Sequence, residues 1–211
     1  MPHPFRSLTA GPVRWHGPVL LAAYIGFAVG AFFCFLRIDP QLVQRRLQAN
    51  EREPEQGRII RFGSPLLAAI FSPPGFDHRL GWSRAWLGAE PTWLEVFSLA
   101  MVLGAELAMA RVLWINRYAG RTIRVEEDQK VIGGGPYRVV GHPIYAFTLV
   151  RFLFPPLVLG SSVALPALLR FLPIYLLRIL NEEKVLRANL LGSTDYCYCE
   201  RTRWRMVPGV W

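Results

Sequence analysis

A glycine-rich segment, GGGPYRVVGHPIY at residues 133–145, is the first place where residue types and spacing suit chemistry. Consecutive glycines can form a loop that approaches a ligand closely. Pro143 suits the first position of a helix, where its missing N–H costs nothing, so His142 is expected at the helix cap. Free N–H groups at such an end favour an anion such as a carboxylate. On its own, the pattern is also typical of a glycine hinge followed by a proline helix start.

A second group of polar residues follows the last apolar stretch and contains Arg178, Asn181, Glu182 and Glu183. Arg178 and Glu182 are four residues apart and therefore share one face of a helix. A carboxylate pair beside an arginine can bind a ribose or an amino group and can hold a polar substrate head. The alternative is a charged collar that ends a membrane helix, since charges at span ends are cheap compared with charges at the centre.

The C-terminal segment 196–211 mixes aromatic residues with Arg201, Arg203 and Arg205, as a basic tail on a membrane surface would. The cysteines give no metal site. Their positions are Cys34, Cys197 and Cys199. A single C-x-C pair is too close and too small for zinc, so we predict free thiols and no metal.

The elements that must position these groups are long apolar blocks separated by polar, arginine-rich stretches. Of 211 residues, 52% are hydrophobic and the formal net charge is +9. Such a charge fits either nucleic acid or loops on the cytoplasmic side of a membrane, and the blocks favour the membrane over nucleic acid. The apolar segments are residues 17–36, 59–76, 93–114, 143–160 and 161–180. We therefore predict an all-α, multi-pass transmembrane bundle of about five spans, the last two forming a helical hairpin.

The basic residues of the polar stretches predict the orientation of these spans. Residues 37–58 are rich in arginine, and with five spans they share a side with residues 118–141 and with the C-terminal tail. That side is expected to be the cytoplasm, and the cofactor pocket is expected to face it. Residues 77–91 are predicted to be a loop on the opposite side, and residues 41–48 a short interfacial helix. A four-span arrangement stays open.

Two arginines, Arg151 and Arg170, lie inside apolar spans of the predicted hairpin. A charge at the bilayer centre costs at least ~2.5 kcal/mol on insertion scales, so both are expected to face the bundle interior or a water-filled cavity. Two roles are open. Each arginine either has a structural role, by snorkelling to the interface or by forming a pair, for example with Glu106, or lines a path for a substrate.

Taken together, these motifs resemble the isoprenylcysteine carboxyl methyltransferase family and the related phospholipid methyltransferases. The resemblance rests on the order G-P-Y-R-x-V-x-H-P-x-Y, a hydrophobic hairpin, R-x-x-x-E-E and a tyrosine-containing basic tail that ends in P-G-V-W. It is firm from about Trp93 onwards and looser over residues 39–82. The chain accordingly divides into membrane spans and a connecting loop over residues 1–92, and a catalytic membrane core over residues 93–211.

The resemblance implies an integral membrane enzyme that transfers a methyl group from S-adenosylmethionine to a lipophilic or prenylated acceptor, with membrane lipid around it. Arg178 would contact the substrate. Glu183 or His142 would accept a proton where the acceptor is an amine, and a carboxylate or thiolate acceptor needs no base. The implied cofactor-binding positions are Glu126, Gln129, Lys130, Val131, Ile132, Tyr137, His142, Pro143, Ile144, Tyr145 and Glu182.

The chain departs from the family pattern at two places. Gly141 stands where the family usually has arginine immediately before the histidine, and Asp195 falls near the family's first tail tyrosine. Two other readings therefore remain. One is an NADPH-dependent enzyme similar to membrane sterol reductases, and the other is a non-catalytic membrane protein that kept the fold. The sequence names neither the acceptor nor the oligomeric state.

Overall fold

The computed structural model describes residues 16–47, 54–88, 90–119, 132–162, 165–169, 172–190 and 202–211. Over these residues every regular element is helical, so the predicted all-α class is confirmed. The elements are α1 (His16–Ile38), α2 (Pro40–Leu47), α3 (Pro54–Leu80), α4 (Trp82–Leu87), α5 (Thr92–Ile115), the 3-10 turn η1 (Gly135–Arg138), α6 (Pro143–Val158), α7 (Leu165–Leu169) and α8 (Leu172–Leu190).

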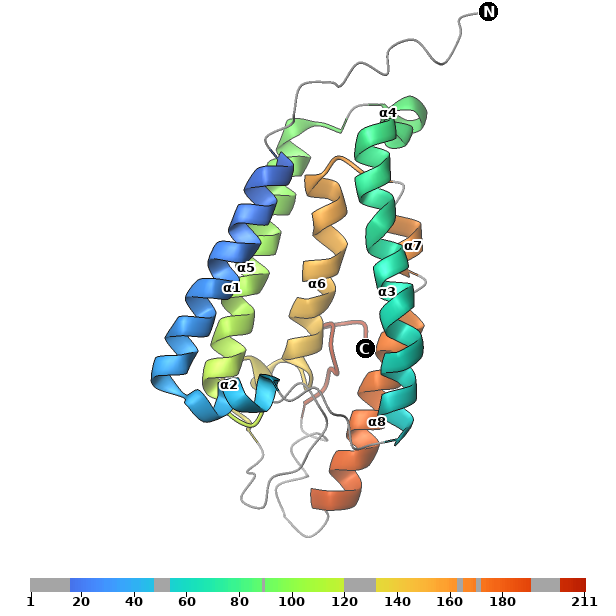
Figure 1. Cartoon of the computed structure of the whole chain (residues 1–211). Helices are drawn as coiled ribbons and strands as arrows, with labels where there is room; N and C mark the ends of the chain where they lie inside the picture. The colour runs from blue at the N-terminus through green and yellow to red at the C-terminus, as the bar shows by residue number, and fades with distance from the viewer. Residues whose placement is uncertain are drawn as a thin grey trace, which may run out of the picture.

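The long helices lie roughly along one direction, with α6 in the middle of the bundle (Figure 1). α5 packs along α6, α1 contacts both, and α3 packs against α8. Apolar side chains join these helices in three buried clusters. Val102 and Val158 belong to the cluster at one end of α5 and α6, and Met109 and Leu113 to a second cluster with α2. Tyr145, Ile179 and Met206 belong to the third, which joins α6, α8 and the C-terminal segment.

Two of the described helices are long and apolar enough to cross a membrane. They are Gly17–Ile38, with 22 residues, and Thr92–Ile115, with 24 residues. At about 1.5 Å per residue either one spans a hydrocarbon layer. The share of buried residues is 6% in the first and 39% in the second, so the first turns most of its apolar side chains outwards. The predicted segments 17–36 and 93–114 are therefore confirmed as long apolar helices.

The prediction of a loop over residues 77–91 is wrong for most of that range. α3 continues to Leu80 through Pro65, Pro73 and Pro74, and α4 follows after one residue. Asp77 is the physical reason, because its Oδ1 accepts a hydrogen bond from the Ser83 backbone N–H at 2.7 Å and so supports the start of α4. Gly81, with φ +70°, makes the turn between the two helices.

Of the predicted span at residues 161–180, the structure describes two helical stretches and the non-helical residues 161 and 162. Leu165–Leu169 forms α7, and α8 begins at Leu172 and runs to Leu190. The helix continues past the predicted span end at residue 180, as the shared helix face expected of Arg178 and Glu182 requires, and the residues that follow, NEEKVLRANL, contain no glycine or proline to stop it. The structure does confirm a helix at Pro40–Leu47, where Asp39 Oδ1 accepts a hydrogen bond from the Leu42 N–H at 3.0 Å.

Candidate functional site

His142 lies at the N-cap of α6 and Pro143 at its first position, as the sequence predicts. The C-terminal segment runs past this point. The backbone N–H of Gly141 donates to the carbonyl of Trp204 at 2.9 Å, and that of His142 donates to the carbonyl of Arg205 at 2.7 Å. These two N–H groups are therefore occupied by the tail, and an anion at this end would have to use groups of the first helical turn.

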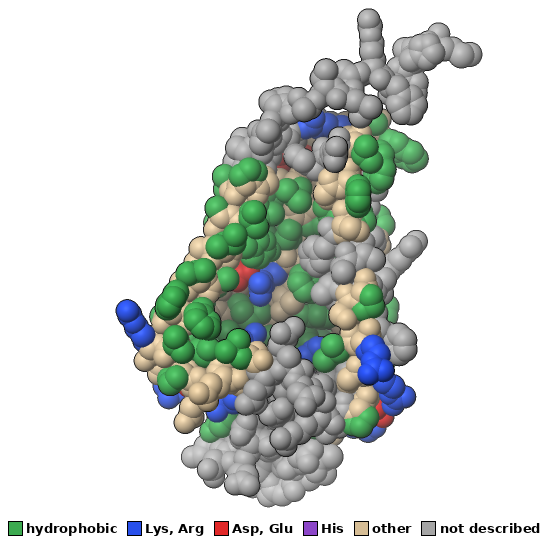
Figure 2. Space-filling view, in the orientation of Figure 1, with side chains coloured by type: hydrophobic (Ala, Val, Ile, Leu, Met, Phe, Trp, Pro, Cys, Tyr) green, Lys and Arg blue, Asp and Glu red, His purple; other side chains and the backbone are tan. Residues whose placement is uncertain are grey.

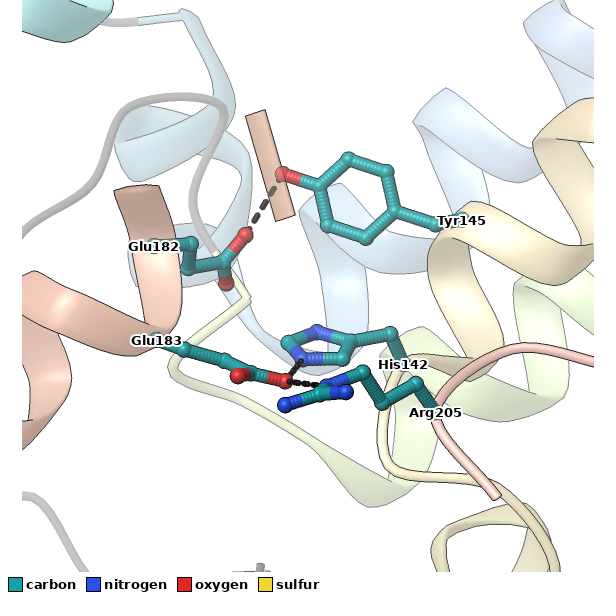
Figure 3. Close-up of polar contacts among 5 residues, drawn as sticks. All are labelled: His142, Tyr145, Glu182, Glu183 and Arg205. Carbon is teal, nitrogen blue, oxygen red and sulfur yellow. Dashed lines mark hydrogen bonds and ion pairs between the residues drawn. The ribbon is translucent and has the colours of Figure 1, made fainter. Parts of the chain in front are cut away.

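Tyr145 lies one turn into α6 and connects two residues of α8. Its hydroxyl donates to Glu182 Oε2 at 2.5 Å and accepts from Arg178 Nε at 3.0 Å. The glutamate and the tyrosine point towards one another from facing helices (Figure 3). The structure thus brings together two motifs that are more than thirty residues apart in the sequence. Arg178 and Glu182 share a face of α8, as predicted, and the tyrosine hydroxyl couples them.

Glu183 forms a second polar group beside the first, again with a partner from α6. Its Oε1 lies 3.2 Å from His142 Nε2 and accepts a hydrogen bond from Arg205 Nε at 2.9 Å. Figure 3 shows that the imidazole and the guanidinium approach the same carboxylate oxygen. The C-terminal segment is therefore held at the site by a side chain as well as by its backbone.

The pKa of Glu183 follows from this environment. Burial raises it, but the hydrogen bonds and charges of His142 and Arg205 outweigh the burial and lower the pKa to about 2. The carboxyl is therefore ionised at neutral pH and is a weak base. A carboxylate with this pKa is suited to binding the donor side chains of His142 and Arg205, and less suited to removing a proton from a substrate.

Aromatic rings enclose the two polar groups. The rings of Tyr145 and Tyr175 meet edge to face with centroids 5.2 Å apart, and His142 meets Tyr145 at 5.7 Å. Ile179 is fully buried beneath them, and Met206 of the tail packs into the same cluster. Edge-to-face contacts and tight packing fix the rotamers of these rings. The two polar groups therefore lie within a rigid apolar environment.

Other residues predicted for the site lie elsewhere or outside the described residues. Tyr137 is buried on the α5 side, where its hydroxyl accepts a hydrogen bond from Asn116 Nδ2 at 2.7 Å. Ile144 packs against the cluster of α1, α2 and α5, and Ile132 is half-buried with no contact to the Tyr145 group among the described residues. The positions that lie outside the described residues are Glu126, Gln129, Lys130 and Val131.

Several residues at the site were not singled out from the sequence as site residues. Tyr175 and Met206 look like ordinary apolar positions in the sequence. Arg205 looks like one more charge of a surface tail, yet it reaches Glu183 and lies over the Trp211 ring, with its Cζ 5.3 Å from the centroid. Sequence spacing carries no signal for these contacts, because that of Tyr175 depends on how α8 packs on α6 and those of Met206 and Arg205 on how the tail folds back.

Of the roles left open for Arg151, the structure shows the ion pair with Glu106. Arg151 Nε of α6 lies 2.5 Å from Glu106 Oε1 of α5, at mid-length of both helices. Tyr24 of α1 adds a third element, because its hydroxyl donates to the Arg151 carbonyl at 3.2 Å. Arg170 lies outside the described residues. The pair ties α5 to α6 above the candidate site.

Gly135 provides a test of the loop that leads into the site. Its φ is +57°, and a Cβ there would lie 2.5 Å from Ile115 Cδ1. We expect Gly135→Ala to destabilise the protein by about 1–2 kcal/mol, because an L-residue is strained at positive φ and the Ile115 side chain must move. Gly134→Ala is the matched control, since a Cβ at Gly134 meets open space. Thermal unfolding of both variants in detergent measures the difference, and equal melting temperatures would contradict this account.

Comparison with known proteins adds nothing to the geometry described above. No protein-family model and no curated protein sequence matches this chain.

Proposed function

We propose that this protein is an integral membrane methyltransferase that uses S-adenosylmethionine and acts on a lipophilic acceptor. The observation that carries the proposal is the convergence of two separate motifs on one place. His142 and Tyr145, from the H-P-x-Y segment, bond directly to Glu183 and Glu182, from the E-E pair of α8. A charged collar at the end of a helix would need no such partners on a facing helix.

The side chains at this place fit the proposed cofactor chemically. Glu182 can accept hydrogen bonds from ribose hydroxyls or from an amino group, and Tyr145 holds that carboxylate in position. The faces of Tyr145 and Tyr175 attract a cation such as a sulfonium. The cofactor, when bound, supplies an electrophilic methyl group. We assign Glu182 to cofactor binding and Arg178 to the acceptor.

The protein's own contribution to such a transfer is alignment and the exclusion of water. Arg178 can grip a carboxylate on the acceptor with two parallel hydrogen bonds. Ile179 and Tyr175 keep the surround apolar, which strengthens these polar contacts. A carboxylate or thiolate acceptor requires no base, and this suits a site whose Glu183 is a weak one. We therefore favour an acceptor that is already anionic, such as an isoprenylcysteine-type carboxylate or another small lipophilic anion.

The proposal includes a multi-pass membrane position with the site facing the cytoplasm. The length and apolarity of α1 and α5 support it. So does α2, whose Arg45 donates to the carbonyl of Arg117 at 2.8 Å and whose Arg46 donates to that of Ala119 at 3.2 Å. These bonds anchor the chain before Glu126 and Gln129, two of the positions that the family resemblance implies for cofactor binding.

Isothermal titration calorimetry on the detergent-solubilised full chain tests the proposal. We expect heat of binding with S-adenosylmethionine or its demethylated product, and none with NADPH. Glu55→Gln serves as a control variant, because Glu55 is an exposed carboxylate that pairs with Lys184 at 3.5 Å. It should bind like the unmodified protein. Binding of NADPH without binding of S-adenosylmethionine or of its demethylated product would overturn the proposal in favour of a reductase.

A further inference from the structure

The Arg151–Glu106 pair lies where a membrane protein can least easily hold charge. Both residues are at mid-length of long apolar helices, and their Nε and Oε1 atoms are shielded from solvent. A charged side chain at such depth is expensive unless it is paired or serves a site. Tyr24 adds its ring, with the Arg151 Cζ 6.0 Å from the ring centroid. The group therefore gathers three polar side chains from α1, α5 and α6.

The two charges are not equally enclosed. The Glu106 side chain is 5% exposed, whereas the Arg151 side chain is 32% exposed. The carboxylate is thus enclosed within the bundle, whereas part of the guanidinium faces outwards. Figure 2 shows basic and acidic surface in the middle of the otherwise apolar, recessed face between α1 and α3. In an apolar layer an outward-facing N–H group that meets no acceptor costs free energy, so this part of the guanidinium is where a further polar partner would bind.

A stripe of polar groups connects this pair with the candidate site. Tyr145, Thr148 and Arg151 follow one another at three-residue steps on α6, so each lies beside the next and the row winds about a third of a turn around the helix. The Thr148 hydroxyl donates to the Ile144 carbonyl at 2.7 Å and lies within hydrogen-bonding reach of Tyr175. From Tyr145 to Arg151 the rise is six residues, or about 9 Å. A lipophilic molecule lying along α6 would reach both places at once.

We infer that Arg151 binds a neutral oxygen, a carbonyl or a hydroxyl, carried by a membrane-dissolved molecule that lies along α6. The oxygen is neutral because Glu106 already balances the charge of the guanidinium, so a further anion would lose its hydration for little net attraction. A guanidinium N–H still forms a strong hydrogen bond to such an oxygen in apolar surroundings. Resting on the proposed function, this makes the acceptor a molecule with a second polar point, a neutral oxygen, in addition to the anionic end assigned to Arg178.

Infrared spectroscopy of a labelled ketone tests the inference without any methyl transfer. The protein is placed in nanodiscs of ether-linked phospholipid, which has no carbonyl, and nonadecan-10-one carrying carbon-13 at its carbonyl is added. Hydrogen bonding to Arg151 should move part of the carbonyl band to lower wavenumber. The double variant E106L/R151M removes both charges without leaving one unpaired, and it should lose the moved band. E55Q/K184M, which removes an exposed pair, should retain it.

A second preparation identifies the source of the oxygen. Nanodiscs of ester-linked phospholipid without ketone show whether a lipid carbonyl gives the same moved band. A moved band in ester-linked lipid without ketone would assign the site to a membrane lipid. A moved band only in ether-linked lipid with ketone would assign it to an acceptor-like molecule. Absence of a moved band in both preparations, or its persistence in E106L/R151M, would overturn the inference. Binding of S-adenosylmethionine is measured by calorimetry on the same samples and does not depend on the carbonyl band. A failure of the proposed function is therefore distinguished from a failure of this inference.

Discussion

Glutamine in place of Glu182 is expected to weaken binding of S-adenosylmethionine about ten- to a hundredfold. The glutamate loses its charge and with it the strength of its hydrogen bonds to the Tyr145 hydroxyl, at 2.5 Å, and to the cofactor. A lost charge-assisted hydrogen bond costs roughly 1.5–3 kcal/mol, which sets this range. Calorimetry on the full chain measures the change, with Glu55→Gln as the exposed carboxylate control.

Arg178→Lys is expected to have the opposite profile. Lysine keeps the charge but cannot reproduce the two-pronged grip on an acceptor carboxylate, so turnover should fall about ten- to a hundredfold. Cofactor affinity should stay nearly unchanged. The structure adds a third variant, Tyr145→Phe, which keeps the ring and removes the hydroxyl that joins Arg178 to Glu182. If all three substitutions weaken cofactor binding equally, the group acts as one structural unit and the division of roles is wrong.

Residues whose positions depend on local chain geometry could be predicted from the sequence. His142 and Pro143 begin α6 because proline fits the first helical position. Arg178 and Glu182 share a face of α8 because four residues make about one turn. The pairing of Arg151 with Glu106 was also predictable, since each charge inside an apolar segment needs a partner and few are available.

Contacts between distant segments could not be predicted in the same way. From the sequence, with three prolines, residues 59–76 are either a short span or a re-entrant piece, yet α3 runs through them as one helix to Leu80. The helix continues because helices can carry proline where neighbouring groups satisfy the freed carbonyls, and that depends on packing. The tail shows the same limit. Nothing in its spacing indicates that Arg205 lies beside Glu183, because that contact forms only when the chain returns to α6.

The C-terminal segment is expected to leave the site when its side-chain anchor is removed. Arg205→Met deletes the hydrogen bond to Glu183 at 2.9 Å but keeps a long apolar side chain. Losing it costs roughly 1.5–3 kcal/mol, so exchange of the Gly141 and His142 amides should accelerate about ten- to a hundredfold. Those amides report directly, because they donate to the carbonyls of Trp204 and Arg205. Hydrogen exchange read by mass spectrometry measures it.

Arg203→Met is the matched control for this release. Arg203 is another arginine of the same segment, and its guanidinium lies over the Trp204 ring, 4.9 Å from the centroid. It should leave the exchange of the two amides almost unchanged. Equal acceleration in both variants would mean that total basic charge, rather than the contact with Glu183, holds the tail.

Acid should release the same segment, and the sign follows from the pKa of Glu183. Folding lowers that pKa from 4.5 to about 2, so the ionised carboxylate stabilises the docked tail above about pH 4.5. The stabilisation is lost as the pH falls towards 2, where His142 and Arg205 face a neutral acid. A spin label at Val210→Cys, an exposed position, reads the mobility of the tail once the native cysteines are replaced. Mobility should rise between pH 4.5 and 2, whereas Glu183→Gln should already be mobile at neutral pH. An unchanged acid transition in Glu183→Gln would place the titrating group elsewhere and leave the tail held by its backbone bonds to Gly141 and His142 and by the packing of Met206.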